Sequence, residues 1–213
     1  MSIPTFIPWA KVVTWKIFWF WIKIVSFWFN ANIWSVYEEF WESSLRFSIA
    51  WSSFSKFEIK SDKAHQELQK ICTANIKNEP GKCIYTHMLN PDGGIETDLT
   101  VVCIDKNHFR IISSAATRER DKFHIKKYLS KDIELKDITD DLCVFGLFGP
   151  KSRDLIKTIS KDNFDNDNFK FGAAKYITIE GIKIWAQRLS YVGELGYELY
   201  VEFKDAKVSR AAE

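Results

Sequence analysis

The stretch Cys83–Val102, CIYTHMLNPDGGIETDLTVV, predicts a β-hairpin. Two apolar, β-rich runs flank the turn sequence NPDGG at residues 90–94. Proline fixes φ and the two glycines allow positive φ, so this pentapeptide favours a reversal of the chain. We therefore expect two antiparallel strands that are joined at residues 90–94.

The second arm of this hairpin carries a carboxylate at a defined position. Side chains alternate between the faces of a strand. We therefore expect Ile95, Thr97, Leu99 and Val101 on one face and Glu96, Asp98 and Thr100 on the other. A third strand at 108–113 would place Asp98 on the middle strand of a meander, which is a rigid position for a functional group. The pattern alone also fits a solvated outer face of an antiparallel sheet.

The sequence from Ser52 onward predicts an α+β fold, with antiparallel sheets and packed helices. Residues 54–60 alternate as a half-buried strand that places Phe57 and Ile59 on one face. A helix follows, for which Ser61 or Asp62 is the expected cap. Further predicted elements are a helix at 116–129 with solvated early turns, a strand at 143–149, a helix ending at 159, a hairpin about Gly181 and a strand after Gly196.

The composition excludes several classes of function. A charged fraction of 27% and a net charge of +2 give no electrostatic reason to expect a nucleic-acid partner. The four cysteines and four histidines are scattered and do not form a metal-binding motif, so we expect no metal site. Unpaired thiols of this kind suit a reducing compartment.

Residues 1–51 form an atypical segment rich in tryptophan and phenylalanine. Eight of the nine tryptophans lie between Trp9 and Trp51, and no glycine precedes Gly81. Lysines interrupt every apolar window that would be long enough for a membrane span, so a membrane location is not expected. Two origins stay open: a frameshift or misplaced start in the gene model, and an anchor that lies in a membrane interface.

Four motifs together resemble the folate-binding domain of the aminomethyltransferase family, which includes the glycine-cleavage T-protein. They are YTHMLN at 85–90 with GGIETDL at 93–99, FGPKS at 148–152, YVGELGYE at 191–198 and SSFSKFEI at 52–59. The forms GGIETDL and YVGELGYE are more similar to the folate-binding half of dimethylglycine and sarcosine dehydrogenases. The resemblance covers residues 52–203 and predicts a domain at 52–213 with the aminomethyltransferase folate-binding fold.

The resemblance assigns roles to four residues. Asp98 matches an essential aspartate beside the reacting nitrogens of the folate, and we expect it to be catalytic. Tyr85 and Tyr191 match tyrosines that line the folate pocket. Glu198 matches the glutamate that binds the amino and ring N–H groups of the pterin, adjacent donors that a carboxylate can accept together.

The function implied by this resemblance is that of a tetrahydrofolate-binding module. It would accept a one-carbon unit from an oxidised N-methylglycine-type substrate and give 5,10-methylenetetrahydrofolate. Because no G-x-G-x-x-G motif occurs, FAD is expected only in a separate or missing domain, and a flavin-dependent dehydrogenase domain or subunit is the expected partner. The alternatives are a glycine-cleavage aminomethyltransferase and a non-catalytic regulatory relative of the same fold.

The end of the sequence and the expected location follow from the same resemblance. An arginine-bearing segment and a final β-barrel of the family do not follow Glu213, so we expect a fragment whose fold is truncated at the C-terminus. The expected location is cytoplasmic, or the mitochondrial matrix for a eukaryotic source.

Overall fold

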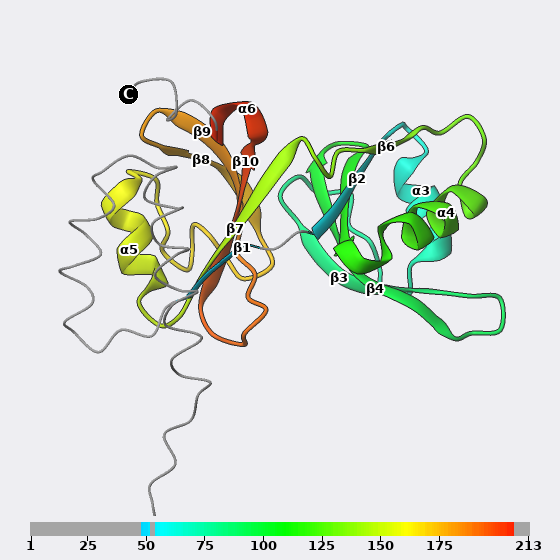
Figure 1. The fold of residues 1–213 in the computed structure, drawn as a ribbon, viewed down its shortest axis with the longest axis horizontal. Coiled ribbons are helices and arrows are strands. Elements are labelled where there is room, and N and C mark those ends of the chain that lie inside the picture. Colours follow the sequence, from blue (N-terminus) through cyan, green and yellow to red (C-terminus); the bar gives the residue numbers. More distant parts are fainter. Residues whose placement is uncertain (1–47, 52–53, 207–213) are drawn as a thin grey trace, which may run out of the picture. The chain divides into compact units, whose positions relative to one another are not determined.

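The computed structural model describes residues 48–51 and 54–206, whose strands form two antiparallel sheets (Figure 1). Sheet I contains, in spatial order, β3 (Cys83–Leu89), β4 (Ile95–Asp105), β5 (His108–Ser114), β2 (Phe54–Lys60) and β6 (Leu135–Asp137). Sheet II contains β1 (Ser48–Trp51), β7 (Leu142–Phe148), β10 (Gly196–Glu202), β9 (Ile182–Gln187) and β8 (Ala174–Ile179). The helices are α3 (Ala64–Ile71), η1 (Ala115–Thr117), α4 (Arg118–Tyr128), α5 (Ser152–Ile159) and α6 (Phe203–Ala206).

The hairpin predicted from Cys83–Val102 is confirmed. Strands β3 and β4 pair antiparallel, with His87 opposite Asp98, and β5 pairs with the other edge of β4. The strand that carries Asp98 is therefore in the middle of the predicted meander. The predicted faces are confirmed for Thr97 and Leu99, which are buried, whereas Ile95 is 67% exposed because it lies at the end of the strand beside the turn.

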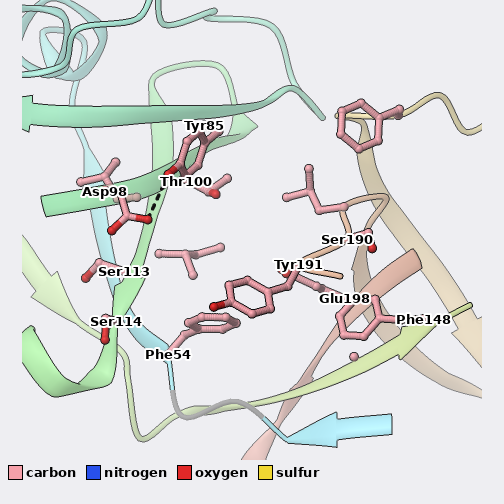
Figure 2. Close-up of a pocket in the computed structure, with 15 residues that line it drawn as sticks. Phe54, Tyr85, Asp98, Thr100, Ser113, Ser114, Phe148, Ser190, Tyr191 and Glu198 are labelled. Atoms are coloured by element: carbon pink, nitrogen blue, oxygen red, sulfur yellow. Dashed lines mark hydrogen bonds between the residues drawn. The ribbon is translucent and has the colours of Figure 1, made fainter. Parts of the chain in front are cut away.

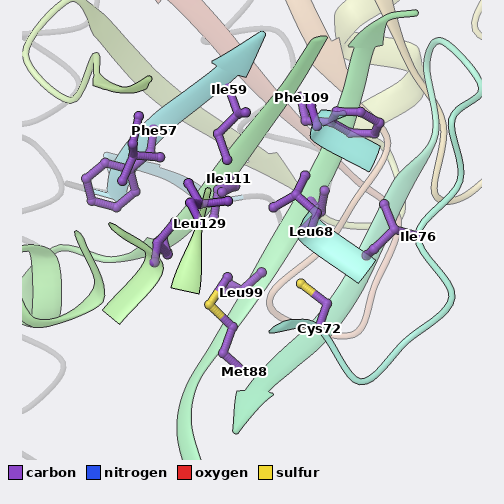
Figure 3. Packing of buried hydrophobic residues seen from close by; sticks show 14 of the residues in the cluster. Phe57, Ile59, Leu68, Cys72, Ile76, Met88, Leu99, Phe109, Ile111 and Leu129 are labelled. Atoms are coloured by element: carbon purple, nitrogen blue, oxygen red, sulfur yellow. The ribbon is translucent and has the colours of Figure 1, made fainter. Parts of the chain in front are cut away.

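Sheet I has a hydrophobic core that it shares with α3 and α4 (Figure 3). Phe57 and Ile59 of β2 are fully buried there, as their spacing predicts, and Leu68 of α3 packs into the same cluster. A second cluster joins the two sheets, because Val102 and Ile112 of sheet I pack with Val144, Trp185 and Tyr200 of sheet II. This second cluster fixes the faces of the two sheets that line the site described below.

Two local predictions about the helices are wrong. The N-cap of α3 is Lys63, whose side chain makes no capping hydrogen bond, rather than Ser61 or Asp62. The Oγ of Ser61 accepts a hydrogen bond from the backbone N–H of Lys63, at 3.2 Å. In α4 the first turns are not wholly solvated, since Asp121 is 1% exposed. Its carboxylate accepts hydrogen bonds from the hydroxyls of Thr97 and Thr117, and these bonds compensate for its burial.

The domain division at residue 52 stays a prediction. Residues 1–47 and 52–53 lie outside the described residues, and so does most of the tryptophan-rich segment. Strand β1, at Ser48–Trp51, pairs antiparallel with β7 and so extends sheet II to the N-terminal side of that division. In the described part of the chain, no helix has the length and apolar character that a bilayer span requires.

The hairpin between β8 and β9 contains a strained turn residue, which gives a first prediction. Glu180 has φ 49° and is followed by Gly181 at φ 83°, the pattern of a type I′ turn, in which Asn-Gly is preferred. We expect Glu180→Asn to raise the free energy of unfolding by about 0.5–1 kcal/mol, because asparagine tolerates positive φ better than glutamate. Chemical denaturation measures this change, and an equal or lower stability would contradict it. Glu134→Asn, an exposed position outside this hairpin, is the control.

Candidate functional site

A cavity of about 920 Å³ is lined by residues from both sheets (Figure 2). Sheet I contributes Asp98 and Thr100 from β4 and Ser113 from β5. Sheet II contributes Glu198 from β10 and Phe148 from β7. All four residues that the sequence analysis singles out, namely Tyr85, Asp98, Tyr191 and Glu198, lie on this one cavity.

Asp98 faces the cavity together with Tyr85 of the neighbouring strand. The phenolic hydroxyl of Tyr85 donates a hydrogen bond to Asp98 Oδ2 at 3.1 Å. This bond, together with burial and the charge of Asp98, raises the pKa of the Tyr85 phenol, so the phenol stays a neutral donor. Within the described residues no donor reaches Oδ1, which leaves one oxygen of an exposed carboxylate available to a ligand.

Glu198 is the buried carboxylate of the cavity, with 9% of its surface exposed. Burial raises its pKa above the ordinary value of 4.5, and a hydrogen bond from Tyr200 opposes this shift only in part. That bond joins the Tyr200 hydroxyl to Oε2 at 2.9 Å, and burial holds the pKa of Tyr200 well above its usual value. No described residue donates to Oε1, so a ligand with N–H groups can supply the missing donor and stabilise the ionised form.

Several buried polar atoms, at the cavity or next to Glu198, have no hydrogen-bond partner among the described residues. Ser113 Oγ and Ser190 Oγ belong to residues that line the cavity. Gln187 lies directly opposite Glu198 on β9, is fully buried, and has no partner for either atom of its amide. An unpaired buried polar group costs about 1–3 kcal/mol, so this region is better suited to a polar ligand than to an apolar one.

Aromatic side chains line the rest of the cavity. Tyr191 is 87% exposed, Phe171 is 75% exposed and Tyr85 is 61% exposed. Exposed apolar side chains that gather in one patch often mark a binding site. Phe54 and Phe148 also line the cavity but are more enclosed. A planar aromatic ligand with a polar edge would contact both the polar groups and the aromatic side chains of the cavity.

Sequence reasoning missed three aromatic residues of this cavity: Phe54, Phe148 and Phe171. Phe54 and Phe148 stand in predicted strands and in the motifs SSFSKFEI and FGPKS, but neither pattern assigns them to a cavity. A core phenylalanine and a cavity phenylalanine have the same local pattern. The available signal was the pair of glycines at 146 and 196, since glycine inside a strand often marks a close approach by another group.

Comparison with known proteins identifies the family. The model of the GCVT N-terminal domain matches residues 26–209. The chain belongs to this family. The family predicted from the four motifs is thereby confirmed, and the matched range includes all four candidate site residues together with both sheets.

The relatives of this GCVT domain include enzymes of two kinds. Mitochondrial dimethylglycine dehydrogenase of Rattus norvegicus is 34% identical over 158 residues, which cover 73% of this chain and 18% of that protein. Human mitochondrial sarcosine dehydrogenase is 30% identical over 166 residues and 18% of its length. Aminomethyltransferase of Halothermothrix orenii is 32% identical over 139 residues, 65% of this chain and 38% of that protein. The chain thus spans about a fifth of the two dehydrogenases.

Solved structures support the fold. The glycine cleavage system aminomethyltransferase T from Bartonella henselae superimposes with a TM-score of 0.63 at 15% identity, and the match covers 80% of this chain and 48% of that one. Heterotetrameric sarcosine oxidase from Corynebacterium sp. U-96 gives a TM-score of 0.56 at 11% identity. The predicted fold, α+β with antiparallel sheets and packed helices of the aminomethyltransferase type, is confirmed.

Proposed function

We propose that this chain is a tetrahydrofolate-binding, one-carbon-transfer module of a dimethylglycine or sarcosine dehydrogenase-like enzyme. The single observation that carries the proposal is the cavity with two different carboxylates, Asp98 and Glu198. One is exposed and bonded by a phenol, and the other is buried and has an oxygen without a donor. Two carboxylates in such different surroundings suit two different tasks.

Glu198 is the proposed binding site for the pterin. The 2-amino group and the adjacent ring N–H of a pterin are two parallel donors, and a carboxylate accepts both. The raised pKa of Glu198 supports this role, because an ionised carboxylate at a buried position needs such donors. The unpaired amide of Gln187, opposite Glu198 on β9, and the unpaired Oγ of Ser113, on the sheet I side of the cavity, offer further hydrogen-bonding groups.

Asp98 is the proposed catalytic residue. Its negative charge would stabilise the positive charge that develops on the folate as the one-carbon unit arrives, and a carboxylate there can also accept a proton. Tyr85 holds one oxygen of Asp98 in place by its hydrogen bond, and the other oxygen remains available for the ligand. Tyr191 and the other aromatic side chains would enclose the ring system.

The proposed donor is a one-carbon unit at the oxidation level of formaldehyde, released when a flavin-dependent dehydrogenase domain or subunit oxidises an N-methylglycine-type substrate. FAD would be bound by that domain. The relatives named dimethylglycine and sarcosine dehydrogenase support this reading, and because they are mitochondrial, we propose the mitochondrial matrix if the source is eukaryotic. The relatives named aminomethyltransferase support a second candidate, in which an aminomethyl group comes from a lipoyl carrier.

Calorimetry with the full chain tests the proposal. We expect tetrahydrofolate to bind and 5,10-methylenetetrahydrofolate to form from formaldehyde faster than in a reaction without protein. Product from an aminomethylated lipoyl carrier, with release of ammonia, but not from formaldehyde would favour the second candidate. No heat with any reduced folate would contradict both and would favour a non-catalytic relative of the same fold.

The affinity for tetrahydrofolate is expected to depend on pH through Glu198. Because its pKa in the free protein is raised by burial, Glu198 is protonated at pH values above 4.5 at which an ordinary glutamate is ionised. Binding to N–H donors needs the carboxylate, so the affinity should fall up to tenfold per pH unit as the pH decreases below the raised pKa, with release of a proton on binding. Calorimetry in two buffers of different ionisation enthalpy measures this release.

The control for this prediction is the protonation of the ligand alone, which is measured separately and subtracted. An affinity that stays constant down to pH 4.5 would contradict the prediction.

The raised pKa of Glu198 also affects the stability of the folded protein, with a defined sign. A carboxyl whose folded pKa is raised contributes stability that is fully present below 4.5 and is lost as the pH rises through the raised pKa.

A further inference from the structure

Four residues form a square on one face of sheet II, beside the buried carboxylate. In the register of β7 and β10, Gly146 lies opposite Glu198 and Phe148 lies opposite Gly196. Residues two apart on a strand share a face, so all four project from the same side of the sheet. All but Gly196 line the cavity. The two glycines therefore stand at opposite corners of the square, each next to Phe148 and next to Glu198.

The ring of Phe148 occupies the space above both glycines. A Cβ atom added to Gly146 would meet ring atoms Cε2 and Cζ of Phe148 closer than 3.0 Å, a separation that real Cβ atoms essentially never show. A Cβ atom added to Gly196 would meet Cδ1 of the same ring equally closely. The ring thus lies against the backbone of two neighbouring strands, and only glycine at both positions permits this placement.

This arrangement puts an aromatic surface immediately beside Glu198. Phe148 is 6% exposed and lines the cavity together with Glu198 (Figure 2), and the two residues are diagonal neighbours in the register of β7 and β10. The ring helps to exclude water from the carboxylate, whose pKa is raised by burial. A ligand that places a donor edge against Glu198 therefore brings the rest of its ring over Phe148.

We propose that Phe148, supported by Gly146 and Gly196, is the stacking surface and a specificity-determining residue for the planar pyrimidine ring of the ligand bound by Glu198. The proposal rests on the proposed function. Offset stacking of two aromatic rings contributes an affinity factor of about 3 to 10 beyond the burial of apolar area. The class of ligand is a planar heteroaromatic ring with two adjacent N–H donors on one edge, which Glu198 binds while Phe148 contacts the face.

The test compares Phe148→Leu with the wild-type chain. Leucine keeps an apolar side chain at this position but lacks a flat π-face. We expect a loss of about 3- to 10-fold in affinity for tetrahydrofolate, and the same factor for a tetrahydropterin that lacks the aminobenzoyl-glutamate tail. Equal factors for the two ligands show that the lost contact is with the ring. Calorimetry measures both, and thermal denaturation checks that each variant is folded.

Phe123→Leu is the matched control, because Phe123 is an exposed phenylalanine of α4 that does not line the cavity. We expect it to change the affinity for the tetrahydropterin by less than twofold. A second variant, Gly146→Ala, keeps the phenylalanine but displaces its ring, and we expect it to weaken binding of the tetrahydropterin as well. This variant tests whether binding depends on where the ring of Phe148 lies, and not only on the presence of a phenylalanine at position 148.

Two results would overturn the proposal. If Phe148→Leu binds the tetrahydropterin within twofold of the wild-type chain, Phe148 is not a stacking surface, whereas the proposed function stands as long as the wild-type chain binds tetrahydrofolate. If the wild-type chain binds neither ligand, the proposed function fails and this inference fails with it.

Discussion

Asp98→Asn is expected to abolish one-carbon transfer while tetrahydrofolate still binds. Asparagine has the same shape and its side-chain oxygen can still accept the hydrogen bond from Tyr85, but it has no negative charge and cannot accept a proton. Loss of electrostatic stabilisation and of acid–base catalysis at one position costs about 10²–10⁴-fold in rate. Because Asp98 is exposed, its replacement should not disturb folding.

The measurement is the rate of 5,10-methylenetetrahydrofolate formation at saturating tetrahydrofolate, with the rate in the absence of protein subtracted. Calorimetry on the same sample should give a dissociation constant within about threefold of the wild-type value. Asp92→Asn, an exposed aspartate in the turn of the same hairpin, is the matched control and should keep the full rate. A variant at Asp98 that retains most of the rate would remove this residue from the mechanism.

Glu198→Gln is expected to have the largest effect on binding. Glutamine can still accept the hydrogen bond from Tyr200, so the sheet should stay intact, but a neutral amide cannot accept two N–H donors as a carboxylate does. Hydrogen bonds to a charged group contribute about 1.5–3 kcal/mol each, so we expect the loss of one of them to lower the affinity for tetrahydrofolate by about 10- to 150-fold. Glu198→Ala should lose binding as well, and also stability, because it leaves the Tyr200 hydroxyl unpaired.

Glu202→Gln is the control for this prediction. Glu202 lies four residues further along β10, is exposed, and forms an ion pair with Lys204 away from the cavity. Calorimetry should give the wild-type affinity for this variant. If Glu198→Gln and Glu202→Gln bind equally well, the pterin does not bind at Glu198, and the orientation of the ligand proposed for Phe148 is also excluded.

Much of the fold follows from local signals in the sequence. The NPDGG turn specifies the β3–β4 hairpin, and alternation of side chains specifies the buried faces of β2 and β4. The errors concern side chains whose surroundings come from distant parts of the chain. The charged pattern of the helix predicts that Asp121 is solvated, whereas its side chain is buried. One of its hydrogen-bond donors is the hydroxyl of Thr97, which lies 24 residues earlier in the sequence and belongs to a different element.

The candidate site was predictable only in part. Asp98, Tyr85, Tyr191 and Glu198 were predicted from motifs, and the structure places them on one cavity, although their individual roles stay predictions. The position of Phe148 was not predictable, because its neighbours Gly196 and Glu198 lie about fifty residues away and become adjacent only through the pairing of β7 with β10.

The sequence by itself determined the hairpin that carries Asp98 and the family to which the chain belongs, since turns, alternation and motifs are local and survive without tertiary contacts. Only the tertiary structure decided that the polar face of β4 lines a cavity rather than facing bulk solvent. The physical reason is that a strand pattern fixes which side chains share a face but not what lies opposite that face. Here the second sheet lies opposite, and it brings a buried carboxylate and an aromatic ring into the same cavity.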